Sequence, residues 1–147
     1  MNEFNKIPDK LMAIIEEFRA IEPGEKMDLL LHFASQLPPL PDWILENKKI
    51  LQPIPGCTTP VFIYGEKQNG KMVYFFDVPT ESLTVRGFVS MLWEGLQNLT
   101  PEQILSTPGN FYLEMGLERI LTPQRLNGIS AILGYMKRFA LAATSSE

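Results

Sequence analysis

The sequence contains one cysteine, Cys57, and one histidine, His32, among its 147 residues. A single cysteine cannot form a disulfide within the chain, and one cysteine with one histidine is too few ligands for a dedicated zinc or iron site. The glycines are scattered and form no phosphate-binding loop. We therefore expect a protein without a structural disulfide, a bound metal or a resident cofactor.

The sequence also has no excess of basic charge and no long apolar run. Lys and Arg number 13 against 17 Asp and Glu, so the net charge is −4. No basic cluster offsets this balance, which argues against a nucleic-acid-binding surface. No stretch approaches the roughly 18 apolar residues of a membrane span. Residues 1–6 lack the basic start and apolar segment of a signal peptide. We expect a cytoplasmic protein that binds neither nucleic acid nor membrane.

The residues that are present predict one globular domain over 1–147, because 45% are hydrophobic and 20% are charged. Apolar residues at helical spacing predict two helices, over 8–21 and 25–37, that pack as a hairpin. Pro23-Gly24 separates them. Six prolines between residues 38 and 60 then exclude a long helix.

Two runs rich in β-branched and aromatic residues follow, at 61–64 and 72–76, with Asn69-Gly70 between them. This pattern predicts an antiparallel hairpin, extended to three strands if residues 48–52 pair at its edge. Helical spacing returns over 85–96, and Thr-Pro pairs at 100 and 122 predict the starts of two more helices. The fold class is α+β, with helices packed on one face of a small antiparallel sheet of two to three strands.

Cys57 lies on a short segment that is rich in proline and glycine. Pro55-Gly56 predicts a turn before the cysteine, and Gly56 can adopt a positive φ and allow the backbone of another chain to approach. Pro60 lacks an N–H where the strand would begin, so pairing should start after the cysteine. We expect Cys57 on a stiff loop at the mouth of the sheet.

The loop alone does not decide whether Cys57 is a buried, inert thiol or a reactive one. No ionisable side chain lies between Gln52 and Pro60 except Cys57 itself, so a hydrolase would depend on His32 as its base. An unactivated thiol suits a sulfur acceptor, because the partner enzyme can supply the rest of the chemistry. A docking module without chemistry is the other alternative. Arg125 is a further candidate, since the first turn of a helix disfavours a cation, although a surface arginine has the same pattern.

Three segments together resemble the SufE family of sulfur-acceptor proteins, which includes CsdE. The resemblance covers most of the chain. Its motifs are Gly-Cys-x-Ser-x-Val-Trp, Leu-Thr-Pro-x-Arg-x-x-Gly and Val-Lys-Gly-Leu, matched here at residues 56–62, 121–128 and 85–88. The chain departs from the family pattern at Thr59, which replaces serine, and at Phe62, which replaces tryptophan. Pro79 and Glu81 stand in place of an acidic pair.

The resemblance implies a protein that accepts persulfide sulfur from a pyridoxal-phosphate-dependent cysteine desulfurase, activates that enzyme and passes the sulfur to a scaffold for iron–sulfur cluster assembly. It also implies an α+β fold similar to that of IscU-type scaffolds. Cys57 would be the acceptor, while Gly56, Thr58 and Arg125 would contact the partner. Such a chain is a sulfur-transfer accessory protein rather than a stand-alone enzyme. Its particular desulfurase and any homodimer are left open.

We also expect partial shielding of the cysteine, because a persulfide is easily lost to reductants. Ile54 and Val61 are apolar residues on either side of the loop and would contribute to a pocket for the sulfur.

Overall fold

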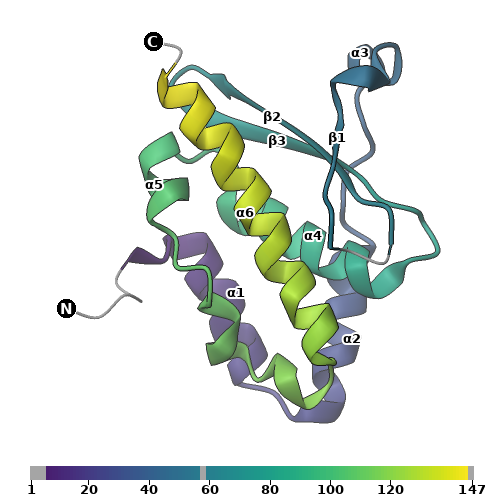
Figure 1. Ribbon diagram of the computed structural model, residues 1–147. Coiled ribbons are helices and arrows are strands. Elements are labelled where there is room, and N and C mark those ends of the chain that lie inside the picture. The colour runs from purple at the N-terminus through teal and green to yellow at the C-terminus, as the bar shows by residue number, and fades with distance from the viewer. Residues whose placement is uncertain (1–5, 57–58, 146–147) are drawn as a thin grey trace.

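The computed structural model describes residues 6–56 and 59–145 and has the predicted α+β architecture. Its antiparallel sheet has the strand order β1-β2-β3. Figure 1 shows the sheet at one end of the molecule, α1 and α2 at the other end, and α6 reaching from one to the other. The elements are α1 (Asp9–Arg19), α2 (Pro23–Ala34), α3 (Asp42–Leu45), η2 (Lys48–Ile50), β1 (Gln52–Pro53), β2 (Phe62–Gln68), β3 (Lys71–Asp77), α4 (Leu83–Leu96), α5 (Pro101–Ser106), η3 (Phe111–Met115), η4 (Leu117–Arg119) and α6 (Pro123–Ser145).

The predicted hairpin is formed by β2 and β3. Asn69 and Gly70 turn the chain with φ values of 53° and 82°, as a two-residue hairpin turn of type I′ requires. Alternate residues along both strands are buried, among them Ile63, Met72 and Tyr74, so one face of the sheet belongs to the core.

The third strand is present but is not where the sequence pattern placed it. Residues 48–50 form the short helix η2, and only Gln52 and Pro53 pair with β2, opposite Ile63 and Phe62. Pro53 and Pro55 lack backbone N–H groups, so a longer ladder cannot form along this edge. The edge strand is therefore short and leads directly into the loop that carries Cys57.

Helix α4 packs against α1, α2 and the sheet. The predicted apolar face is confirmed, since Val85, Phe88, Val89, Leu92 and Leu96 are buried and Trp93 is half-buried. Two glycines allow the close helix packing: an added Cβ at Gly87 would lie 2.6 Å from the Leu30 carbonyl oxygen of α2, and one at Gly95 would lie 2.9 Å from a Leu11 methyl of α1.

Helix α2 begins earlier and ends earlier than predicted. Pro23 occupies its first turn, and the Glu22 and Glu25 side chains form a capping box, so Pro23-Gly24 starts the helix rather than separating two helices. Its buried face consists of Lys26, Leu30, Phe33 and Ala34, whereas Leu31, which the spacing assigned to the core, is exposed. The α1–α2 pair meets through stacked Phe18 and Phe33 rings with centroids 6.1 Å apart.

The two Thr-Pro starts are confirmed. In α5 the Thr100 hydroxyl accepts the Gln103 N–H at 3.2 Å, and the Gln103 side chain accepts the Thr100 N–H at 3.0 Å. Helix α6 begins at Pro123, and Thr122 accepts the Arg125 N–H at 3.3 Å. The predicted apolar face of α6 is buried at Ile129, Leu133, Met136 and Ala140.

Candidate functional site

The loop between β1 and β2 is anchored at both ends by the hydrophobic core. The Ile54 N–H donates to the Val61 carbonyl at 2.9 Å, which extends the pairing of the two strands by one step. Ile54 is 4% exposed and Val61 is 1% exposed, and both belong to the main core cluster. Ile54 and Val61 are therefore the two fixed ends between which the chain passes from β1 to β2. Cys57 and Thr58 lie outside the described residues.

Gly56 forms the turn that precedes the cysteine in sequence. Its φ is +90°, a left-handed value that favours glycine. Nothing lies within 4 Å of an ideal Cβ at this position, and Pro55, Gly56 and Pro60 are all exposed. The described ends of the loop are thus open to approach by another protein. The predicted shielding of the Cys57 sulfur concerns an atom outside the described residues and stays a prediction.

Arg125 lies in the first turn of α6 and its side chain is half-buried. Its backbone N–H is used by the Thr122 cap. Within residues 6–56 and 59–145, no hydrogen bond joins Arg125 to Gly56. The structure thus holds Gly56 and Arg125 on separate elements, the predicted contact Thr58 lies outside the described residues, and the role of each of the three stays a prediction.

His32 is exposed on the last turn of α2, as expected for a surface residue. Its Nε2 lies 3.0 Å from Nε2 of Gln36, four residues further along the chain. The imidazole is therefore engaged beside its own helix. None of the hydrogen bonds that the described residues form links His32 to the ends of the Cys57 loop, so the hydrolase interpretation gains no support.

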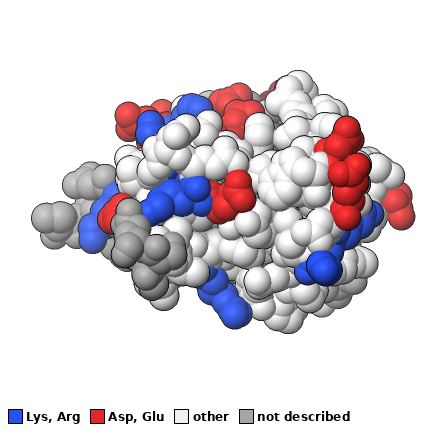
Figure 2. Space-filling model, turned by 90° about the horizontal axis from the view of Figure 1, so that it is seen from above, with Lys and Arg blue, Asp and Glu red and all other residues white. Residues whose placement is uncertain are grey.

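Aromatic side chains cover the outer face of the sheet, a feature that the sequence did not predict. The Trp43 ring of α3 lies edge-on to Tyr64 and Phe75, with centroid distances of 6.0 and 5.5 Å. Trp43 is 44% exposed, and Phe75 is half-buried. Figure 2 shows a broad uncharged area at this end of the molecule. The alternation of Phe62 and Tyr64 along β2 was the signal available in the sequence.

Tyr64 is the titratable group of this aromatic cluster. Partial burial raises the pKa of its hydroxyl, and Glu66 raises it further. The hydroxyl donates to Glu66 Oε1 at 3.0 Å, so the neutral phenol is the stabilised form. The Tyr64 side chain is therefore a hydrogen-bonded member of the aromatic cluster.

Among residues 6–56 and 59–145, no group of three or more His, Cys, Asp or Glu side chains is arranged to hold a metal ion. None of the helices over the same residues is both long enough and apolar enough to cross a membrane.

Comparison with known protein families identifies a match over most of the chain. The model of the family SufE, described as an Fe-S metabolism associated domain, matches residues 12–140. An uncharacterised SufE-like protein of Mycobacterium tuberculosis strain H37Rv is 36% identical over 133 residues, covering 90% of this chain and 92% of the relative. A cysteine desulfuration protein SufE of Wigglesworthia glossinidia brevipalpis is 28% identical over 142 residues, covering 95% and 93% of the two chains.

A solved structure has the same fold. The solution structure of a hypothetical protein from Thermus thermophilus aligns with a TM-score of 0.83 at 33% sequence identity. The alignment covers 95% of this chain and 98% of that chain. The α+β arrangement predicted from the sequence is therefore shared over nearly the whole length of both chains.

Proposed function

Because the chain belongs to the SufE family, whose domain is associated with iron–sulfur metabolism, we propose that it accepts persulfide sulfur on Cys57 from a cysteine desulfurase. The observation that carries this proposal is the family match over residues 12–140, which spans the Cys57 loop and the start of α6. A role as a sulfur-transfer protein follows from the family. The acceptor residue, the activation of the desulfurase and the delivery to a scaffold are our proposal.

The proposed step is a thiol exchange. The Cys57 thiolate attacks the terminal sulfur of the desulfurase persulfide, a new S–S bond forms at Cys57, and the S–S bond of the donor breaks. The desulfurase cysteine leaves as a thiolate, so charge and electrons balance without an external oxidant or reductant. A scaffold thiolate then attacks the terminal sulfur of Cys57–S–SH in the same way.

The described ends of the loop support this proposal. Ile54 and Val61 anchor the two ends of the loop in the core. Gly56 turns the chain, and nothing lies within 4 Å of the position that a Cβ would occupy there. A sulfur donor needs room to reach the acceptor, since exchange depends on access as well as on the thiolate fraction. We propose that Gly56, Thr58 and Arg125 contact the desulfurase around the loop and that the relay operates in the cytoplasm.

Intact-protein mass spectrometry tests the acceptor residue. The chain is incubated with a cysteine desulfurase, pyridoxal phosphate and L-cysteine, and peptide mapping locates any added sulfur. We expect a gain of sulfur on Cys57 that a reductant removes, and no gain for Cys57→Ser or when L-cysteine is omitted. An unmodified Cys57 in a mixture where the desulfurase turns over would contradict the proposal.

Two variants, Cys57→Ser and His32→Ala, separate the two other interpretations. A docking module without chemistry predicts that Cys57→Ser binds the desulfurase and stimulates it as well as the wild-type chain does. A cysteine hydrolase predicts that His32→Ala removes activity. We expect the opposite in both cases: Cys57→Ser loses stimulation, whereas His32→Ala retains sulfur acceptance because His32 engages Gln36 on the surface of α2.

A further inference from the structure

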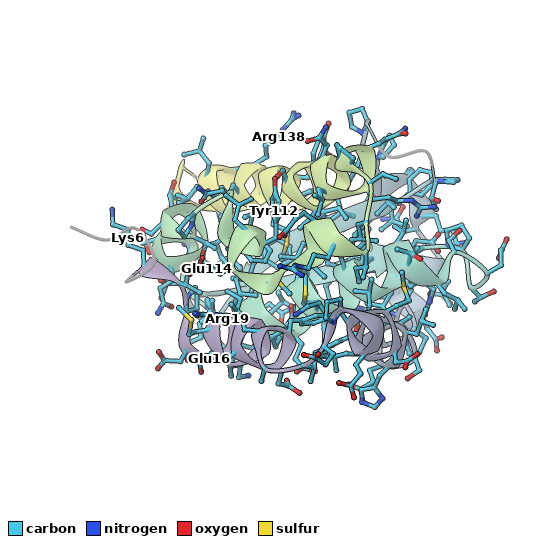
Figure 3. The ribbon with its side chains drawn as sticks, turned by 90° about the horizontal axis from the view of Figure 1, so that it is seen from below. Lys6, Glu16, Arg19, Tyr112, Glu114 and Arg138 are labelled. Atoms are coloured by element: carbon cyan, nitrogen blue, oxygen red, sulfur yellow. The ribbon has the colours of Figure 1, made fainter. Side chains whose placement is uncertain are left out.

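A cleft opens at the end of the molecule opposite the sheet, between the α1–α2 connection and the η3–η4 segment. Its volume is about 340 Å³. Three cationic side chains from three different elements line it: Arg19 from α1, Lys26 from α2 and Arg119 from η4. Figure 3, seen from below, shows Arg19 on α1 and Glu114 on η3 at this end. The chain has a net charge of −4, so a concentration of positive charge here is unexpected.

Lys26 is the buried member of this cationic cleft. It is 4% exposed, and its ammonium group donates to the carbonyl of Phe18 in the last turn of α1. An ammonium group has three donors, so this carbonyl uses one of them. Gly116 allows the lysine to reach this place, because an added Cβ there would lie 3.1 Å from Lys26 Cε and 3.3 Å from Nζ. The backbone of Gly116 has a φ of +72°.

The charges that line the cleft do not neutralise one another. Two carboxylates, Glu22 and Glu114, also line it. Glu22 is already used, because its side chain accepts the N–H of Glu25 in the capping box of α2. Across the described ranges, neither Arg19 nor Arg119 forms an ion pair or a side-chain hydrogen bond. Three cations therefore line the cleft against two carboxylates, and neither arginine is paired with either carboxylate.

We propose that this cleft binds a small oxyanion of the phosphate type. Guanidinium groups present pairs of N–H donors that match the oxygens of a tetrahedral anion, and an ammonium group adds a point charge. Arg19 of α1 and Arg119 of η4 would contact the anion together with the buried Lys26. A concave site with a buried cation fits a small anion better than it fits the flat surface of a protein partner. The proposal is independent of Cys57 and of sulfur transfer.

Titration of the full chain with inorganic phosphate tests the site. Sodium chloride keeps the ionic strength constant, and amide chemical shifts are followed by NMR. We expect saturable shifts confined to residues around Lys26 and Gly116. Arg19→Gln and Arg119→Gln should each weaken binding about tenfold, the loss typical of one charge-assisted hydrogen-bonding partner. Sulfate should compete with phosphate for the same residues.

Two further variants make the test specific. Arg138→Gln removes an arginine of α6 that lies over the Tyr135 ring at 4.6 Å and does not line the cleft (Figure 3), so phosphate binding should be unchanged. Glu114→Gln removes one of the two carboxylates and should tighten binding, a gain that a damaged fold cannot imitate. The proposal is overturned if Arg19→Gln and Arg119→Gln bind phosphate like the wild type, or if the shifts scatter over the surface and chloride alone produces them.

Discussion

Tyr74 connects the sheet to two helices through one side chain and its own backbone. Its hydroxyl donates to the Met136 carbonyl of α6 at 2.7 Å. Its backbone N–H donates to Gln97 at 3.1 Å, and its carbonyl accepts from the Trp93 indole at 3.1 Å. The ring lies against Gly65, which stands opposite Tyr74 in the hairpin and leaves space that a side chain would fill. The backbone N–H and carbonyl of Tyr74 in β3 are therefore both hydrogen-bonded, to Gln97 just after α4 and to Trp93 within α4.

Tyr74→Phe should lower the free energy of unfolding by about 1–2 kcal/mol, the usual cost of losing one buried hydrogen bond. Burial raises the pKa of Tyr74 above its ordinary value of 10.0. The neutral phenol therefore contributes stability that is complete below the unfolded-state pKa and is lost as the pH rises toward the folded-state pKa. The difference between wild type and Tyr74→Phe should shrink or reverse in strong alkali.

Urea unfolding at a series of alkaline pH values measures this difference. Tyr112→Phe is the control, since within the described chain the Tyr112 hydroxyl makes no hydrogen bond; Tyr112 is half-buried, whereas Tyr74 is fully buried. Its unfolding midpoint should follow that of the wild type. Equal midpoints for Tyr74→Phe and Tyr112→Phe at neutral pH would show that the contact with Met136 does not stabilise the fold.

Arg125 provides a second prediction at this scale. Its backbone takes part in the α6 cap, whereas its guanidinium group is available to a partner, so Arg125→Ala should keep its stability. Stimulation of the desulfurase should fall about tenfold if one charge-assisted contact is lost. Arg138→Ala, on the same helix, should stimulate normally. Unchanged stimulation by Arg125→Ala would remove this residue from the proposed partner surface.

Among the elements, α4 shows how a pattern of buried residues becomes a packing arrangement. Its apolar face follows from residue spacing, but its contacts with α1 and α2 depend on Gly95 and Gly87. A glycine inside a helix normally costs stability relative to alanine. At these two places the cost is offset by the close approach of a neighbouring helix.

Gly87→Ala and Gly134→Ala should therefore have opposite effects. An added Cβ at Gly87 meets the Leu30 backbone at 2.6 Å, so the helices must separate and stability should fall by about 1–3 kcal/mol. Nothing lies within 4 Å of an added Cβ at Gly134 of α6, so the helix propensity of alanine should raise stability by about 0.5–1 kcal/mol. Urea unfolding midpoints compare them, and a destabilised Gly134→Ala would contradict the propensity argument.

The whole molecule should unfold as one domain, because one core cluster includes residues from the helices and from the sheet. The two tryptophans report from different places: Trp43 on the outer face of the sheet and Trp93 within α4. Fluorescence of Trp43→Phe and Trp93→Phe should therefore give the same urea midpoint as far-UV circular dichroism of each variant. Separate midpoints would indicate two folding units. A midpoint that rises with protein concentration would identify a homodimer.

The sequence by itself determined the local elements. Thr100 and Thr122 begin helices because a hydroxyl cap and a following proline satisfy the first turn, and Asn69-Gly70 turns the hairpin because both residues tolerate positive φ. The α+β class followed from these short-range preferences. Cys57 and Arg125 were candidates from their places in the sequence, and the family motifs supplied the roles proposed for them, which residue spacing alone could not have supplied.

Only the tertiary structure decided what depends on residues distant in the chain. The burial of Lys26 requires a carbonyl from α1 and a glycine from the η3–η4 segment. The spacing of apolar residues along α2 does not predict it. The edge strand is confined to Gln52–Pro53, because proline limits its pairing with β2. Trp43 lies on the outer face of the sheet, and Arg19 and Arg119 line one cleft. Both arrangements depend on packing between elements, which no local sequence pattern encodes.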